Sequence, residues 1–241
     1  MRHTEYFLRS HAFFCLIDSF CFFLDLKTDR YLCTDGRDFQ LLGPHLHGWS
    51  TKDETAAHGN TRISPSSGRL AIELLAQGIL SDHPADYKDA RPTPTIQPVR
   101  ALHELGTQKL PLLRRPLAFY FLKAAATANR HLRRNALEFT IQSIARQKQS
   151  RVGGASAFDT ERIASLTLGF NRLRLTFPRS YLCLFDSIAL MHFLAFYNIH
   201  PTLVFGVRAE PFGAHCWVQA DDVALNDTIE HVSQFTPIMS V

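Results

Sequence analysis

The sequence predicts an α+β protein built from two domains. Near the N-terminus, short apolar runs with strand-like spacing are followed by helical patterns, and in the second half a long helical stretch is followed by strand-like runs. Between the halves, residues 81–100 contain four of the 12 prolines and almost no bulky apolar side chain. This composition is typical of an extended linker. We therefore expect a domain over residues 1–82, a linker over 83–109 and a second domain over 110–241.

The N-terminal part has the pattern of a β-hairpin followed by helices. Two apolar or aromatic runs flank a short polar turn, and a further apolar run precedes them. Strands followed by helices predict a small winged-helix-like module. The expected strands cover residues 12–17, 20–26 and 30–34, and the expected helices cover residues 35–49 and 67–80.

Three roles are open for this module: a stabilising lobe, binding of a nucleic-acid duplex, and capture of a peptide along an exposed strand edge. The predicted helix over 69–80 carries one Arg and one Glu, so it offers no row of base-reading side chains. Duplex binding is therefore the weakest of the three. Peptide capture is the better functional alternative, and the stabilising lobe stays open beside it.

Composition limits the partners and the compartment. The 26 basic and 22 acidic residues give a net charge of only +4, which does not predict a nucleic-acid partner. Five cysteines without a C-x-x-C pair argue against a zinc ribbon or a disulfide framework and favour the reducing cytoplasm. Asp18 and Asp25 interrupt the apolar run at 12–26, so we expect no signal peptide. No run reaches the ~20 apolar residues of a membrane helix, and we expect no membrane partner.

The helical stretch over residues 117–148 carries a row of basic side chains. Such a row is usually the solvated face of a helix, and we favour this interpretation over an anion-binding site. The residues concerned are Lys123, Arg130, Arg133, Arg134 and Arg146.

Cys183 has the position expected of a reactive thiol. Ser180 can cap a helix, and the apolar pattern that follows places Cys183 in its first turn. Free backbone N–H groups and the positive end of the helix dipole lower the pKa of such a thiol from its usual ~8.5. The cysteines in strand-like apolar runs are expected to be inert packing residues: Cys15, Cys21 and Cys33.

Two strands after this helix carry further polar residues. Side chains alternate along the strand that begins at His215, so Cys216 should point away from His215 and serve in packing. A three-residue hairpin loop at 220–222 would pair His215 with Asp227 at a Cβ separation of ~5 Å. Asp222 would then take the left-handed conformation of the loop, whereas a two-residue loop would place Asp227 on the wrong face.

A cysteine at a helix start, a histidine on a strand and an aspartate on the next strand are the arrangement of papain-like and transglutaminase-like thiol enzymes. The imidazole of His215 would take the proton of Cys183, and Asp227 would orient the imidazole and stabilise its charged form. A zinc site made from the same three residues is the less favoured alternative, because closed zinc sites normally contain ligand pairs at short spacing.

Three segments resemble the transglutaminase-like leader peptidases of lasso-peptide biosynthesis, the B proteins. They are CLFDSIAL at 183–190, LVFGVRAEPFGAHCWVQADDVALND at 203–227 and VSQFTPI at 232–238. The resemblance implies a catalytic triad of Cys183, His215 and Asp227. It also implies that the N-terminal domain is a PqqD-like recognition domain whose hairpin binds the leader peptide. The corresponding peptide-binding residues are Arg30, Tyr31, Leu32, Cys33 and Thr34.

Two positions depart from the pattern of related enzymes. No Gln stands shortly before Cys183 to donate to an oxyanion, so the only donor that we name is the Cys183 backbone N–H. Asp222 stands where some members of the resembled family have Gly.

The function implied by the resemblance is that of a cysteine peptidase. It would bind a lasso precursor peptide, cleave off the leader and free the core N-terminus for macrolactam formation by a partner, an asparagine-synthetase-like lasso cyclase. The resemblance also implies ATP dependence, although the sequence contains no phosphate-binding loop. Two alternatives remain: an acyltransferase or amide synthase on the same triad, and a non-catalytic peptide-binding scaffold.

Overall fold

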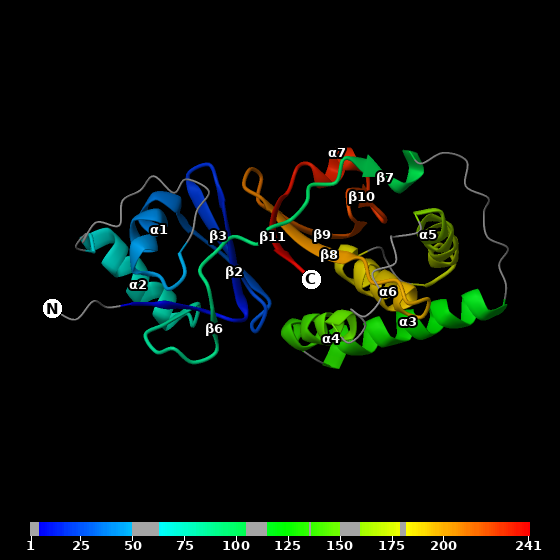
Figure 1. Ribbon diagram of the computed structural model, residues 1–241, viewed down its shortest axis with the longest axis horizontal. Coiled ribbons are helices and arrows are strands. Elements are labelled where there is room, and N and C mark those ends of the chain that lie inside the picture. The colour runs from blue at the N-terminus through cyan, green and yellow to red at the C-terminus, as the bar shows by residue number, and fades with distance from the viewer. Residues whose placement is uncertain (1–4, 50–62, 105–114, 135, 150–159, 179–181) are drawn as a thin grey trace. The chain divides into compact units, whose positions relative to one another are not determined.

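The computed structural model describes residues 5–49, 63–104, 115–134, 136–149, 160–178 and 182–241 (Figure 1). The chain divides into two compact units, Met1–Pro94 with Ala209–Pro211, and Thr95–Arg208 with Phe212–Val241. Both units combine helices and strands, which confirms the predicted α+β class. None of the described helices is long and apolar enough to cross a membrane.

The predicted linker over 83–109 contains the boundary between the units, at Pro94–Thr95. It is also partly built into their sheets. Strand β6 (Tyr87–Lys88) pairs with a strand of the first unit, and β7 (Arg100–Ala101) pairs with a strand of the second. The proline-rich composition therefore marks a change of unit and is compatible with short strands at both of its ends.

The first unit contains two three-stranded sheets. One has the order β2-β3-β4 and is antiparallel, with β2 (Ala12–Ile17), β3 (Phe20–Asp25) and β4 (Arg30–Asp35). All three strands were predicted, to within one residue at each end. The other sheet has the order β5-β1-β6, in which β1 (Phe7–Arg9) is the central strand and β5 (Leu80–Ser81) and β6 pair with it on either side.

Local side chains fix the turn of the β3–β4 hairpin. The Asp25 carboxylate accepts hydrogen bonds from the backbone N–H groups of Lys27 and Thr28, at 2.9 and 3.4 Å. Asp29 takes a left-handed φ of 54°, which Asp tolerates better than most residues. The polar turn residues thus set the register of the strand that follows.

Two capped helices complete the first unit. Helix α1 (Gly36–Leu42) begins after Asp35, whose carboxylate accepts from the N–H of Arg37 at 2.7 Å, and a 3-10 turn (Gly43–His45) follows it. Helix α2 (Pro65–Ala76) begins after Ser64, which caps it in the same way. Helix α2 ends before the predicted residue 80, because Leu80 already belongs to β5, and the first helical segment ends at His45 and not at residue 49.

The second unit is built on one five-stranded sheet with the order β11-β8-β9-β10-β7. Strands β8 (Thr202–Arg208) and β9 (Gly213–Ala220) form its centre, and β10 (Val223–Ala224) and β11 (Thr236–Ser240) flank them. Helix α6 (Cys183–Ala195) is buried along most of its length and packs on β9 and on helix α3 (Figure 1). The remaining helices are α3 (Arg115–Arg134), α4 (Leu137–Gln149), α5 (Thr160–Arg174) and α7 (Ile229–Val232).

The predicted continuous helical stretch over 117–148 is two helices, α3 and α4. A straight helix that buries Ala124 and Ala128 would next bury positions near 135, 139 and 142 at its period of about 3.6 residues. Helix α4 instead buries Leu137, Ile141 and Ile144. One straight helix cannot bury both sets, so the chain breaks between them. The five basic side chains of the stretch are all exposed, as their interpretation as a solvated face predicts.

Candidate active site

Cys183 is the first residue of helix α6, and its side chain is exposed. The cap position before it is occupied by Leu182, which makes no side-chain cap, and the predicted cap Ser180 lies outside the described residues. The Asp186 carboxylate fills this role from inside the helix. It accepts from the Leu182 N–H at 3.2 Å and forms an ion pair with the buried Arg174 of α5. The helix start that carries the thiol is therefore held by a neighbouring helix.

A buried polar network fixes α6 against β9. Ser187, one turn after Cys183, donates its hydroxyl to the carbonyl of Cys216 at 3.2 Å. The same hydroxyl accepts from the side-chain N–H of Asn226 at 2.9 Å. The side-chain oxygen of Asn226, Oδ1, accepts from the Val218 N–H at 2.8 Å. Since Cys183 and Ser187 lie on one face of the helix, this network places the thiol against the same strand.

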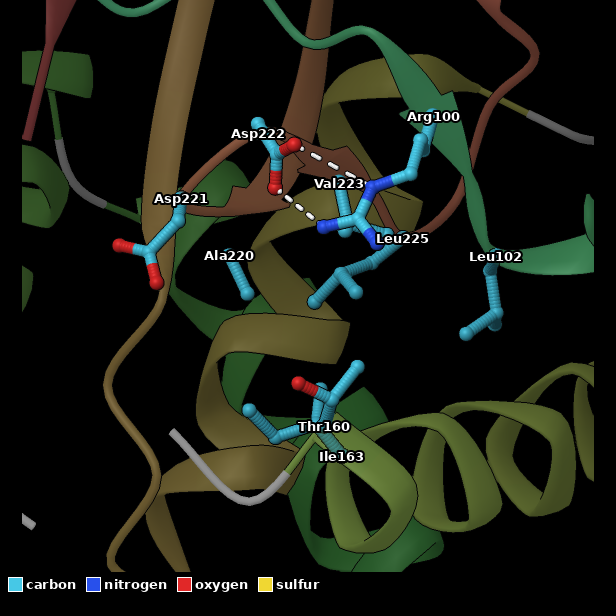
Figure 2. A pocket seen from close by; sticks show the side chains of 9 residues that line it. All are labelled: Arg100, Leu102, Thr160, Ile163, Ala220, Asp221, Asp222, Val223 and Leu225. Carbon is cyan, nitrogen blue, oxygen red and sulfur yellow. Dashed lines mark hydrogen bonds and ion pairs between the residues drawn. The ribbon is translucent and has the colours of Figure 1, made fainter. Parts of the chain in front are cut away.

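The predicted three-residue loop between β9 and β10 is wrong. Val223 pairs with Ala220, which leaves a two-residue turn of Asp221 and Asp222. The left-handed residue is Asp221, with a φ of 49°, and not Asp222. Asp222 instead forms an ion pair with Arg100 at 2.8 Å, at the edge of a pocket at this end of β9 (Figure 2).

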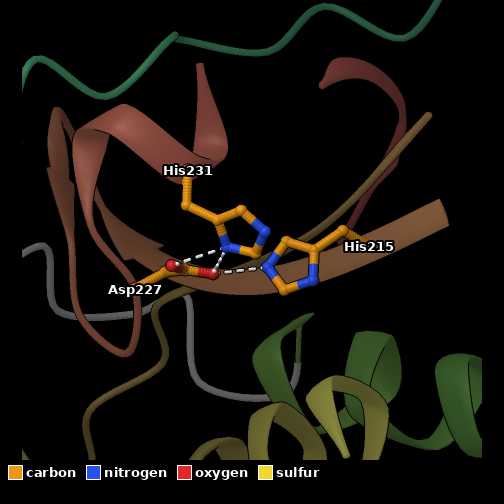
Figure 3. A group of neighbouring side chains, drawn as sticks. All are labelled: His215, Asp227 and His231. Atoms are coloured by element: carbon orange, nitrogen blue, oxygen red, sulfur yellow. Dashed lines mark hydrogen bonds and ion pairs between the residues drawn. The ribbon is translucent and has the colours of Figure 1, made fainter. Parts of the chain in front are cut away.

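Asp227 reaches His215 in spite of this shorter turn. The ladder between β9 and β10 continues only to the hydrogen bond from the Leu225 N–H to the Val218 carbonyl, at 2.8 Å. The side chain of Asn226 then takes the Val218 N–H, so the backbone leaves the sheet before Asp227. The alternation rule therefore does not apply to Asp227, and its carboxylate hydrogen-bonds His215 Nε2 (Figure 3). The expectation that a two-residue loop separates these residues was also wrong.

The charges of Cys183 and His215 depend on each other. Hydrogen bonds with Cys216 and His215 lower the pKa of Cys183 to about 4, although burial acts in the opposite direction. Burial alone would lower the pKa of His215, but hydrogen bonds with Asp227 and Cys183 raise it to about 9. Since Nε2 faces Asp227, Nδ1 is the nitrogen left for Cys183. Between these two pKa values, a thiolate and an imidazolium form an ion pair.

Cys216 does more than pack. Its side chain is buried, as predicted, but its thiol is also in hydrogen-bond contact with Cys183. This contact and burial raise the pKa of Cys216 well above its ordinary value. Cys216 therefore stays protonated and donates to the Cys183 sulfur. This role was not predicted, because alternation along β9 gives the face to which Cys216 points but not the residue of the packed helix that it contacts.

Two aromatic side chains, Trp217 and Phe235, form a wall beside the imidazole of His215. Its ring lies 6.1 Å from Trp217 and 5.2 Å from Phe235, measured between ring centroids. Gly206 of β8 pairs with His215, and a Cβ on Gly206 would lie 2.9 Å from atoms of both Phe235 and Trp217. A side chain at this position would displace the wall, so the sheet needs glycine there.

His231 of α7 is a neighbour that the sequence analysis did not identify. Its Nδ1 lies 3.0 and 3.1 Å from the two carboxylate oxygens of Asp227, and its ring centroid lies 4.5 Å from that of His215 (Figure 3). The sequence does contain a signal for this contact. Thr228 is a residue type that caps helices, and His231 follows Asp227 by four residues, which is about one helical turn. In the described part of the chain, these three residues also form a possible metal-ligand group, which differs from the zinc alternative through Cys183.

The five predicted peptide-binding residues lie together on β4, an edge strand of the first unit. β4 pairs with β3 on one side, and none of the described strands pairs with its other side. The side chains of Arg30 and Cys33 are exposed, and those of Tyr31, Leu32 and Thr34 are half-buried. An edge of this kind presents backbone groups to which an extended peptide can bind.

The arrangement of Cys183, His215 and Asp227 is the one typical of thiol enzymes, and a comparison with protein families relates this part of the chain to such a superfamily. Residues 126–240 match the model of the transglutaminase-like superfamily, so the C-terminal part of the chain contains a transglutaminase-like domain. That superfamily includes cysteine peptidases and acyltransferases, typically with a Cys-His-Asp site. No significant match to the chain was found among the curated proteins or among the solved structures.

Proposed function

We propose that this protein is a cysteine peptidase that removes the leader from a lasso-peptide precursor. The observation that carries the proposal is the hydrogen-bonded series Cys183, His215 and Asp227, in which the thiol has a depressed pKa and the imidazole a raised one. The transglutaminase-like domain supports the thiol chemistry. The resemblance of the segments at 183–190, 203–227 and 232–238 to the B proteins supports the substrate.

In the proposed reaction, the Cys183 thiolate attacks the carbonyl carbon of the last leader residue. The Cys183 backbone N–H, at the start of α6, donates to the oxyanion that forms. His215 then gives its Nδ1 proton to the leaving amine, which becomes the N-terminus of the core, and a thioester remains on Cys183. His215 next takes a proton from water, which attacks the thioester and releases the leader as a carboxylic acid. Asp227 holds His215 by Nε2 throughout.

The leader would bind as an added strand along the outer edge of β4. Backbone hydrogen bonds would supply affinity there, and alternate side chains would contact the strand formed by Arg30–Thr34. The freed core amine would pass to an asparagine-synthetase-like lasso cyclase. We assign ATP no step on this chain, because the sequence contains no G-x-x-x-x-G-K-[ST] phosphate-binding motif.

Incubation of the full chain with a synthetic precursor in H₂¹⁸O tests this proposal by mass spectrometry. The expected products are the intact core and a leader that carries one ¹⁸O in its new carboxylate. The same reaction with added glycinamide identifies an acyltransferase, which would yield the leader amide in place of the acid. Cys183→Ala is the inactive control. An unchanged precursor, with and without cyclase and ATP, would leave only the role of a binding scaffold.

A further inference from the structure

We infer that His231 is a positioning residue of the active site, a fourth member that fixes the carboxylate of Asp227 against His215. This inference deepens the proposed function and rests on it, since it assigns a role within the same Cys-His-Asp series.

The first support is the geometry of the two imidazoles around one carboxylate. His215 Nε2 bonds to Asp227 Oδ2, while His231 Nδ1 lies 3.0 Å from Oδ1 and 3.1 Å from Oδ2. Figure 3 shows both rings directed at this carboxylate from different elements, one from β9 and one from α7. Because Asp227 carries a charge and only accepts, His231 must hold its proton on Nδ1 to bond it.

The second support is the way in which the chain builds this contact. Asp227 Oδ1 accepts from the Thr228 N–H at 2.8 Å, and the Thr228 hydroxyl accepts from the His231 N–H at 3.3 Å and so caps α7. The cap places His231 one turn after Asp227. Phe235 then packs edge-on against the His231 ring, with 5.4 Å between centroids. Cap, helix and aromatic side chain together hold the ring in one orientation.

The consequence for the reaction concerns the plane of the carboxylate. The Thr228 N–H and His215 Nε2 each bond one oxygen of Asp227, which leaves the carboxylate some rotation about its Cβ–Cγ bond. A donor between both oxygens removes this freedom and keeps Oδ2 on His215 Nε2, which fixes the tautomer and stabilises the imidazolium. Loss of this donor should therefore weaken the thiolate–imidazolium pair from both sides: the pKa of His215 falls and that of Cys183 rises.

Two substitutions separate the hydrogen bond from the bulk of the ring. In His231→Asn the side-chain amide can place an N–H where Nδ1 lies, whereas His231→Leu fills similar space without a donor. The His231 side chain is 47% exposed, so neither change disturbs the core. Glu230→Gln, at the exposed neighbouring position, is the matched control.

The test measures alkylation of Cys183 by iodoacetamide against pH, with exposed Cys33 of the same chain as the reference thiol. In wild type, the thiolate–imidazolium pair should exist over a pH range from about 4 to about 9, limited by the pKa values of Cys183 and His215. This range should narrow at both ends in His231→Leu and be restored in His231→Asn. Precursor turnover should fall roughly ten- to hundredfold in His231→Leu at unchanged KM, the range for a lost hydrogen bond to a charged group.

A purely structural role would lower the Tm of His231→Leu but leave the pH range of alkylation unchanged, and that result would overturn the inference. An Asn variant as impaired as the Leu variant would overturn it as well. Failure of the proposed function has a different signature: wild-type Cys183 itself would then alkylate like Cys33, or would alkylate as expected without any cleavage of the precursor.

Discussion

The Cys183 sulfur has two hydrogen-bond partners, and both change its pKa in the same direction. Cys216 and His215 both lower the pKa of Cys183, and the contact with Cys216 has the larger effect. The helix start adds free N–H groups on the other side of the thiol. The position of Cys183 near the start of α6 was predictable from the sequence, since a long apolar pattern follows it. The roles of Cys216 and His231 were not, because they arise from how α6 and α7 lie on the sheet.

Cys216→Ala should raise the pKa of Cys183, because it removes a donor to the thiolate. At pH 5 the alkylation rate of Cys183 should fall roughly twofold, which is the loss of thiolate expected when its pKa rises by about one unit from about 4. Cys216→Ser keeps an O–H donor in the same place and should retain most of the rate. Equal rates at pH 5 for wild type and Cys216→Ala would show that Cys216 only packs.

Asp227→Asn should lower precursor turnover by roughly hundredfold or more with little change in KM. The amide keeps the size of the side chain but loses the charge that stabilises the His215 imidazolium. Asp221→Asn is the matched control, because Asp221 is exposed and its left-handed φ of 49° suits Asn. Steady-state cleavage rates compare the two variants. A near-normal rate for Asp227→Asn would mean that another group supports His215.

At the scale of elements, local patterns predicted the longer strands β2, β3, β4, β8 and β9, but not the strands β1, β5, β6, β7 and β11 or every connection. The hairpin β3–β4 was predictable because its turn is fixed by Asp25, a residue within the hairpin. The β9–β10 turn was not, since Arg100 and Val99, more than a hundred residues earlier in the chain, bond to Asp222. The split between α3 and α4 was likewise set by two buried faces that a single helical period cannot join.

Gly206→Ala tests the wall around His215. The added Cβ would meet Phe235 and Trp217 at 2.9 Å, and both side chains are buried. We expect a loss of about 1–3 kcal/mol in the free energy of unfolding, typical of overpacking, measured by urea denaturation. Gly213→Ala in β9 is the control, because its Cβ would come no closer than 3.5 Å to other atoms. Equal stability of the two variants would contradict the close packing described.

At the scale of the whole molecule, the proposed chemistry and the proposed peptide capture belong to different units. Residues 126–240, which match the transglutaminase-like model, hold all three residues of the candidate triad, whereas β4, the proposed peptide-binding strand, belongs to the first unit. The boundary between the units, Pro94–Thr95, lies within the proline-rich segment. The composition of this segment could not predict that β6 and β7 pair with distant strands, because such pairing depends on tertiary contacts.

The second unit should lose stability in mild acid. Burial, with the nearby His131 and Arg130, lowers the pKa of His192 to about 4, so this ring is neutral in the folded state. The unfolded chain binds its proton near pH 6.5, so stability is full above that pH and falls as pH drops toward about 4. Urea denaturation at pH 7 and pH 5 measures the loss. His192→Leu should reduce this difference, and an unchanged difference would contradict the assignment.

The central claim is that Cys183 carries the acyl group of the leader during cleavage. Rapid acid quenching of wild-type protein mixed with precursor, followed by intact-protein and peptide mass spectrometry, tests it most directly. The proposed mechanism predicts a transient mass increase equal to the leader less one water, located on the peptide that contains Cys183. It also predicts none in Cys183→Ala. An adduct on another residue, or precursor cleavage by Cys183→Ala at the wild-type rate, would contradict the claim.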